Sequence, residues 1–212
     1  MKLLVTAGPT REPIDPARFI SNRSSGKMGY AIAVNALKMG HSVVLISGPV
    51  ALKPPAGVRC VNVITADDML AAVKKNIKKC DALVMAAAVS DFRPAVVNTR
   101  KIKKSAALLS LPLKLNPDIL RVIAMGKGKR IFVGFAAETG RLRSEAMRKL
   151  REKNLDLIVA NDILRQDAGF ESDTNRVTLF FDDGKHRELP LMKKSKIAKM
   201  IIKWIEQKQC RL

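Results

Sequence analysis

The 212-residue sequence has few cysteines, histidines and aromatic residues. Its three cysteines, Cys60, Cys80 and Cys210, stand far apart, and with only two histidines no zinc-binding spacing occurs. We therefore expect reduced thiols in a reducing compartment and no disulfide framework. With one Trp, one Tyr and seven Phe, the core must be built mainly from aliphatic residues.

Long apolar runs are also missing. No uncharged apolar stretch approaches the roughly 20 residues of a membrane-spanning helix. Met1 leads at once into a strand-like segment and not into the charged start of a signal peptide. These absences predict a cytoplasmic protein that makes no contact with a membrane.

Acidic residues are outnumbered, because 19 Asp and Glu face 39 Lys and Arg, for a net charge of +20. Such a balance attracts polyanions, which include nucleic acid, anionic membranes and small phosphorylated substrates. The basic residues are spread along the chain without interleaved aromatic residues, so a base-stacking surface is not indicated. A basic nucleic-acid-binding protein remains an alternative, but phosphorylated substrates are the simpler account.

Apolar runs of strand length alternate with segments of helical period. Runs that are apolar on both faces are typical of a parallel sheet covered by helices on both sides. The sequence therefore predicts a doubly wound, Rossmann-like α/β fold, one domain over residues 1–212. The expected strands cover residues 3–7, 43–46, 58–64, 82–89, 131–136 and 155–160, and the expected helices begin near residues 26, 65 and 192.

Two regions depart from this alternation. Residues 90–115 contain no helical pattern and carry a basic run followed by an extended apolar segment, which suggests a dimer contact. Residues 176–190 alternate in polarity around Asp182-Asp183-Gly184, which predicts a C-terminal β-hairpin.

The segment from Ile20 to Gly29 opens the first predicted helix with two serines and a glycine. The backbone N–H groups and the positive dipole end at such a place can hold a phosphate, although an ordinary helix cap is an equal reading of these residues alone. The segment is not a Walker A loop, because Ser21 and Met28 occupy positions that need Gly and Ser or Thr. The first strand also lacks a GxGxxG continuation, which weakens the alternative of an NADPH- or flavin-linked reductase.

Several blocks of the sequence, taken in order, resemble the phosphopantothenate–cysteine ligase family of bacteria, the phosphopantothenoylcysteine synthetase domain. They span the chain from end to end, so the resemblance is more specific than any single block. The blocks are residues 5–15, 20–22, 24–29, 86–92, 101–104, 116–119, 133–139, 149, 153–156, 160–162, 169–170 and 172–173.

The resemblance implies a reaction with 4′-phosphopantothenate, L-cysteine and CTP as substrates. The carboxylate of 4′-phosphopantothenate attacks the α-phosphate of CTP, and cysteine then opens the acyl-cytidylate to give the amide and CMP. Mg²⁺ is expected to accompany the triphosphate, but no carboxylate cluster marks its protein ligands. The family is dimeric and usually carries a flavin-dependent decarboxylase domain ahead of this one. The ligase is therefore either a separate polypeptide here or one part of a longer protein.

The resemblance also assigns roles to individual residues. Asn22 is expected to hold the acyl-cytidylate, where a neutral amide stabilises oxyanion charge, although a helix-capping role would also suit it. Lys101 resembles the flap lysine that meets the triphosphate, although by itself it reads as a solvated lysine. Ala87, Ala88 and Asp91 are expected beside 4′-phosphopantothenate.

The remaining expected positions belong to the nucleotide. Lys149 and Lys153 lie four residues apart, so they are expected to share a helix face with an anion between them. Asn116 is expected to cap a helix with Pro117 in its first position. The full set of nucleotide residues implied by the resemblance is Gly8, Ser24, Gly26, Gly29, Asp91, Lys101, Asn116, Pro117, Asp118, Ile119, Phe135, Lys149 and Lys153.

Overall fold

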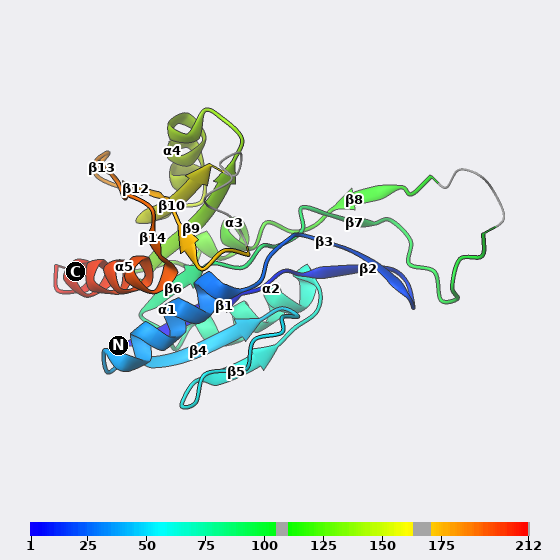
Figure 1. The fold of residues 1–212 in the computed structure, drawn as a ribbon, viewed down its shortest axis with the longest axis horizontal. Helices are drawn as coiled ribbons and strands as arrows, with labels where there is room; N and C mark the ends of the chain where they lie inside the picture. Colours follow the sequence, from blue (N-terminus) through cyan, green and yellow to red (C-terminus); the bar gives the residue numbers. More distant parts are fainter. Residues whose placement is uncertain (105–109, 163–170, 212) are drawn as a thin grey trace.

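A computed structural model describes residues 1–104, 110–162 and 171–211 of the chain. Its centre is an eight-stranded sheet with the order β13-β12-β10-β9-β6-β1-β4-β5 (Figure 1). The strands are β1 (Lys2–Ala7), β4 (Ser42–Ser47), β5 (Arg59–Asn62), β6 (Ala82–Met85), β9 (Ile131–Glu138), β10 (Leu157–Asp162), β12 (Thr178–Phe181) and β13 (His186–Glu188). Six neighbouring strands, β10, β9, β6, β1, β4 and β5, pair in parallel, and β12 and β13 add an antiparallel edge. The predicted fold class and C-terminal hairpin are therefore confirmed.

Successive residues of the strands face opposite helical layers, as the pleat of a strand requires. In β1, Leu3 and Val5 pack in the layer of α1 (Lys27–Lys38) and α5 (Lys194–Gln209). Leu4 packs in the opposite layer, which holds α2 (Ala66–Ile77), α3 (Ile119–Ala124) and α4 (Leu142–Glu152). Both faces of the sheet are therefore buried, and this is why its strands read as continuous apolar runs.

Two hairpins form an arm that projects from the body (Figure 1). One pairs β2 (Arg11–Asp15) with β3 (Arg18–Ser21), and the other pairs β7 (Phe92–Pro94) with β8 (Leu113–Leu115). The sequence predicted that residues 90–115 depart from the alternation of strands and helices, whereas the hairpin at residues 11–21 was not predicted.

Buried polar contacts hold the arm together and fix it to the body. Along the arm, the Asp15 carboxylate accepts the N–H of Ile102 at 3.1 Å. Burial raises the pKa of Asp15, but hydrogen bonds from the backbone, with Arg18 close by, outweigh it and lower the pKa. At its base, the buried Glu12 carboxylate accepts the N–H of Ala66, the first residue of α2, at 2.9 Å. Glu12 thereby anchors the arm to a helix N-terminus.

Some predicted boundaries were wrong. The strand expected over residues 82–89 ends at Met85, because the segment that follows turns to hydrogen-bond the loop after β1. The cap of α3 is Asp118 and not Asn116, since the Asp118 carboxylate accepts the N–H of Arg121. The first turn of α1 is capped by Gly26 without a side-chain hydrogen bond, so the neighbouring serines are not its N-cap.

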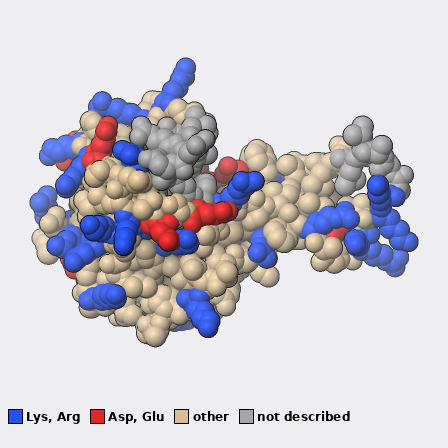
Figure 2. Space-filling model, in the orientation of Figure 1, with Lys and Arg blue, Asp and Glu red and all other residues tan. Residues whose placement is uncertain are grey.

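No helix among the described residues is both long and apolar enough to cross a membrane. Lysine and arginine side chains are distributed over the body and gather again at the end of the arm (Figure 2). The exposed basic residues at that end include Arg100, Lys101, Lys103 and Lys104.

Candidate active site

The chain changes direction in the sheet between β1 and β6. From β1 it proceeds to β4 and β5 on one side, and from β6 to β9 and β10 on the other. Ligands of open α/β sheets bind at such a switch point, outside the carboxyl ends of the strands. A cleft of about 1140 Å³ lies there. It is lined by the segments that follow β3, β6 and β8, by residues of β9 and β10, and by residues of α1, α3, α4 and α5.

The floor of the cleft is the segment that leaves β6. The Ala88 N–H donates to the Gly8 carbonyl at 2.9 Å, and the Ala87 N–H donates to Thr6 Oγ1 at 3.2 Å. The Ser90 N–H donates to Thr10 Oγ1 at 3.0 Å. Ala87 and Ala88 therefore line the cleft on a backbone that β1 and its loop hold in place, and their small side chains leave room for a ligand.

Asn22 stands over this floor. Its side-chain amide donates to the carbonyls of Ala88 at 3.2 Å and Val89 at 3.1 Å. These contacts come from a residue 66 positions distant in the chain, so they orient Asn22 into the cleft and do not cap α1.

At one end of the cleft, the N-terminus of α1 approaches the loops after β1 and β4. Gly26 has a φ of 75°, and a Cβ placed there would lie 2.9 Å from Val50 Cγ1, so a side chain would not fit. With no side-chain cap on the first turn, its dipole end faces the cleft beside Ser24 and Lys27. The helix cap predicted from the serines is therefore absent, and the binding of an anion at this turn stays a prediction.

At the other end, two lysines reach across to carboxylates. Lys149 Nζ lies 2.6 Å from Glu138 Oε1, and Lys153 Nζ lies 3.0 Å from Asp118 Oδ2. Helix α4 ends at Glu152, and Lys153 follows it as the C-cap residue, with its N–H donating to the Lys149 carbonyl at 3.0 Å. That one anion lies between the two lysines stays a prediction. Both lysines still line the cleft, with the predicted residues Asn116, Pro117, Asp118, Ile119 and Phe135.

Buried polar atoms on the cleft wall point to a ligand. Among the described residues, Ser90 Oγ and Asn116 Oδ1 are buried without a hydrogen-bond partner, although the Asn116 amide donates to the Ser90 carbonyl at 2.8 Å. Unsatisfied buried acceptors cost about 1–3 kcal/mol each. A bound molecule with its own donors would satisfy them.

The structure assembles most predicted positions in this cleft but not all. Asn22, Ser24, Gly26, Ala87, Ala88 and Asp91 line it, in addition to those at the lysine end. Gly29 does not, because it packs α1 on β1, where an added Cβ would lie 2.5 Å from Ala7 Cβ. Gly8 supports the floor from beneath through its carbonyl. Lys101 lies on the arm, away from the cleft lining.

Several lining residues were not predicted. Arg23, Lys27, Ser90, Asn161, Asn175 and Lys194 all line the cleft. Lys27, Ser90 and Asn161 fall inside blocks that carried the family resemblance, so their position was available as a signal, and Arg23 stands between two of these blocks. Asn175 and Lys194 fall in no such block, and only the fold brings them to the site. Residues 169–170 of the resembling blocks lie outside the described residues.

Comparison with known proteins identifies the family. The model of the DNA/pantothenate metabolism flavoprotein C-terminal domain matches residues 1–209. The chain belongs to this family. It is 48% identical over 204 residues to the coenzyme A biosynthesis bifunctional protein CoaBC of Bacillus subtilis, covering 96% of this chain and 50% of that protein.

Solved structures agree with this family assignment. The crystal structure of the C-terminal domain of a CoaBC protein is 44% identical, has a TM-score of 0.84, and is matched over 97% of this chain and 94% of that one. The DNA/pantothenate metabolism flavoprotein from Streptococcus pneumoniae is 26% identical with a TM-score of 0.85, over 98% and 99% of the two chains. The chain spans about half the length of the curated relatives it matches.

Proposed function

We propose that this member of the DNA/pantothenate metabolism flavoprotein family is a ligase that joins 4′-phosphopantothenate to L-cysteine with consumption of CTP. The observation that carries the proposal is the cleft at the switch point. It gathers Asn22, the Ala87-Ala88 backbone and the cationic residues of both ends, which come from widely separated parts of the chain. Relatives named for coenzyme A biosynthesis support the same assignment.

The reaction requires two displacements at one place. In the first, a carboxylate oxygen of 4′-phosphopantothenate forms a bond to the α-phosphorus of CTP, and the bond to the β-phosphate oxygen breaks to release pyrophosphate. In the second, the cysteine nitrogen bonds to the acyl carbon, the acyl C–O bond breaks, CMP leaves and the amine loses a proton. The protein supplies positioning and stabilisation of negative charge in both steps.

Asn22 suits the second displacement. Its side chain is oriented by the carbonyls of Ala88 and Val89, the same segment against which the acyl group would lie. A neutral amide keeps its hydrogen-bonding capacity at every physiological pH, so it can hold the acyl-cytidylate without titrating. Asp91 lines the same part of the cleft and would contact the hydroxyl or amide groups of 4′-phosphopantothenate.

The nucleotide would lie along the rest of the cleft. Phe135 and Asn116 through Ile119 would contact the cytidine part, with Lys149 and Lys153 beside them, and Ser24 and Gly26 would contact the phosphates. No group of three or more His, Cys, Asp or Glu among the described residues could hold a metal ion. Mg²⁺ would therefore enter with the triphosphate and lean on its oxygens.

The arm supports a homodimer. It exposes apolar side chains, among them Phe19, Phe92, Val96 and Leu115, which a second copy of the chain would cover. Lys101 lies on the same arm. It would then contact the triphosphate either in the cleft of the partner subunit or, if the arm folds over, in the cleft of its own subunit. The curated relatives are bifunctional proteins twice as long, so a decarboxylase domain is a further proposed partner.

The test incubates the purified protein with 4′-phosphopantothenate, Mg²⁺ and either CTP or ATP, with and without L-cysteine, and identifies products by mass. Pyrophosphate, CMP and the cysteine amide should form with CTP. An Asn22→Asp variant should still release pyrophosphate but accumulate the acyl-nucleotide. The absence of pyrophosphate and of amide with either nucleotide, from protein shown to be folded, would reject the ligase.

A further inference from the structure

Two lysines from different helices lie at the α1 end of the cleft. Lys27 is the first residue of α1 and Lys194 the first residue of α5, and both line the cleft. Their helices share one layer of the fold (Figure 1). Lys194 is only 5% exposed, although it carries an ammonium group. Lysine is almost never buried to this extent unless its ammonium group is paired.

The surroundings of Lys194 oppose its charge. Burial, and then repulsion from Lys27, lower the pKa of Lys194 to about 8, and the opposite charge of Asp173 only partly offsets them. The position at the start of a helix adds to the cost, because the positive end of the dipole disfavours a cation. A methionine of similar length would pack here without these costs.

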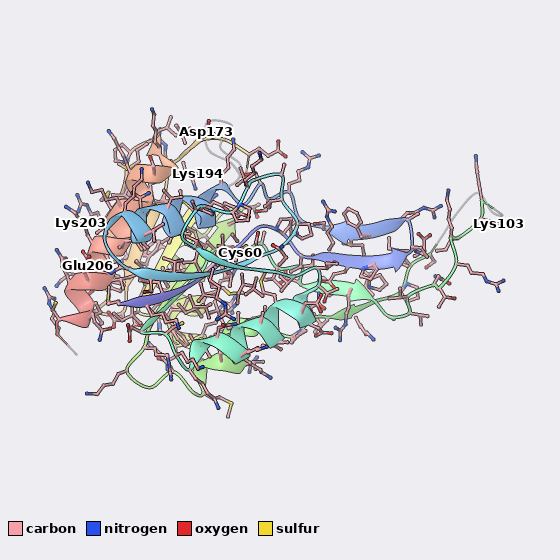
Figure 3. The ribbon with its side chains drawn as sticks, turned by 90° about the horizontal axis from the view of Figure 1, so that it is seen from below. Cys60, Lys103, Asp173, Lys194, Lys203 and Glu206 are labelled. Carbon is pink, nitrogen blue, oxygen red and sulfur yellow. The ribbon has the colours of Figure 1, made fainter. Side chains whose placement is uncertain are left out.

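The acidic residue near this pair is directed mainly to Lys27. Lys27 Nζ lies 2.7 Å from Asp173 Oδ1 and donates to the Glu171 carbonyl at 2.8 Å. The Asp173 side chain is 85% exposed, so water screens it. Figure 3 shows Asp173 and Lys194 together at the start of α5, with Lys203 farther along the same helix. Lys27 and Lys194 thus bring two ammonium groups to this end of the cleft, with Asp173 as an acidic neighbour of both.

We propose that Lys27 and Lys194 form the binding site for the β- and γ-phosphates of the nucleotide, the pyrophosphate that leaves in the first displacement. The inference rests on the proposed function and adds to it a site for the leaving group. Ser24 and Gly26 lie beside the pair in the same cleft, at the uncapped start of α1. A pyrophosphate carries enough negative charge to be shared by two ammonium groups and a helix N-terminus.

This placement also assigns direction to the nucleotide. Its phosphates would extend toward α1 and α5, and its cytidine part toward α3 and Lys153. The α-phosphorus then lies between them, over the floor beside Asn22, where the carboxylate must attack. Repulsion between the two lysines is relieved by the bound anion, so the site favours the bound triphosphate and its pyrophosphate product over an empty cleft.

The test measures binding of inorganic pyrophosphate by isothermal titration calorimetry, with no other substrate present. Lys194→Met and Lys27→Met should each raise the dissociation constant about tenfold or more, as expected for loss of one charge-assisted contact. Lys203→Met removes an exposed lysine from the same helix and should leave binding unchanged. If both cleft variants bind pyrophosphate like the wild-type protein, the site is wrong.

Steady-state kinetics separates this inference from the ligase itself. The KM for CTP should rise in Lys27→Met, while the KM for 4′-phosphopantothenate should stay near the wild-type value. The reverse pattern would overturn the inference and leave the ligase standing. If no ligase activity is found but pyrophosphate binding still depends on both lysines, the anion site stands and the proposed reaction fails.

Discussion

Replacement of Lys194 by methionine should stabilise the unliganded protein, in a manner that depends on pH. Lys194 has a pKa of about 8 in the folded protein, against 10.5 for an ordinary lysine. The folded state therefore releases the proton more readily than the unfolded state does. The penalty is fully present below pH 8 and is lost as the pH rises from 8 to above 10.5, since the group is then neutral in both states.

The size of the effect follows from the displacement of the pKa. Each pKa unit corresponds to 1.36 kcal/mol, so the penalty at pH 7 is at most about 3 kcal/mol, and solvent in the open cleft reduces it to about 2 kcal/mol. Methionine keeps the length of the lysine stem and removes its charge. The free energy of unfolding of Lys194→Met at pH 7 should thus exceed that of the wild-type protein by about 2 kcal/mol, reduced by the energy of any contact that the ammonium group makes.

Urea unfolding of both proteins at several pH values between 7 and 10.5 measures the difference directly. Taking the difference cancels the titration of all other lysines. The advantage of Lys194→Met should shrink as the pH rises, and Lys203→Met, at an exposed position of the same helix, should show no such trend. A difference that is constant over this range, or that grows with pH, would refute the reasoning about Lys194.

Two further substitutions test the body of the fold. Asp156→Asn should destabilise the protein by about 3 kcal/mol in urea unfolding, because the largely buried Lys127 Nζ, 2.7 Å from Asp156 Oδ2, loses its counter-charge. Adding Lys127→Met to this variant should recover much of the lost stability. If the effects of the two substitutions on stability simply add, the two side chains are not coupled and the prediction is wrong. Gly29→Ala should lower the free energy of unfolding by about 1–2 kcal/mol, because crowding against Ala7 exceeds the gain in helix propensity. Unchanged stability with weakened nucleotide binding would instead support the nucleotide-binding role that the sequence predicted for Gly29.

The sheet could be predicted from sequence because burial on both faces leaves a direct trace in the chain. The run Leu3-Leu4-Val5 is apolar throughout, and its alternate side chains enter the two different layers. The hairpin at residues 11–21 left no such trace, since Pro13 interrupts it and the arm exposes much of its surface. Its order depends on distant contacts such as that of Asp15 with Ile102, which no local pattern reveals.

The candidate site shows the same division. The residues around Asn22 and Asn116 could be predicted because they stand in continuous blocks that resemble a known family. Gly29 has a packing contact that the block did not distinguish from a ligand contact. Lys194 follows another lysine in a basic stretch and looks solvated in the sequence, and only the fold shows that it is buried at the cleft.

If a nucleotide activates a carboxylate in this cleft, an oxygen atom passes from 4′-phosphopantothenate to CMP, and oxygen labelling detects this transfer. The measurement supplies 4′-phosphopantothenate with ¹⁸O in both carboxylate oxygens, together with CTP, Mg²⁺ and L-cysteine, and determines the masses of the products. We expect one ¹⁸O atom in CMP and the other in the amide, because the attacking oxygen leaves with the nucleotide. Unlabelled CMP, or CDP with labelled inorganic phosphate, would contradict it.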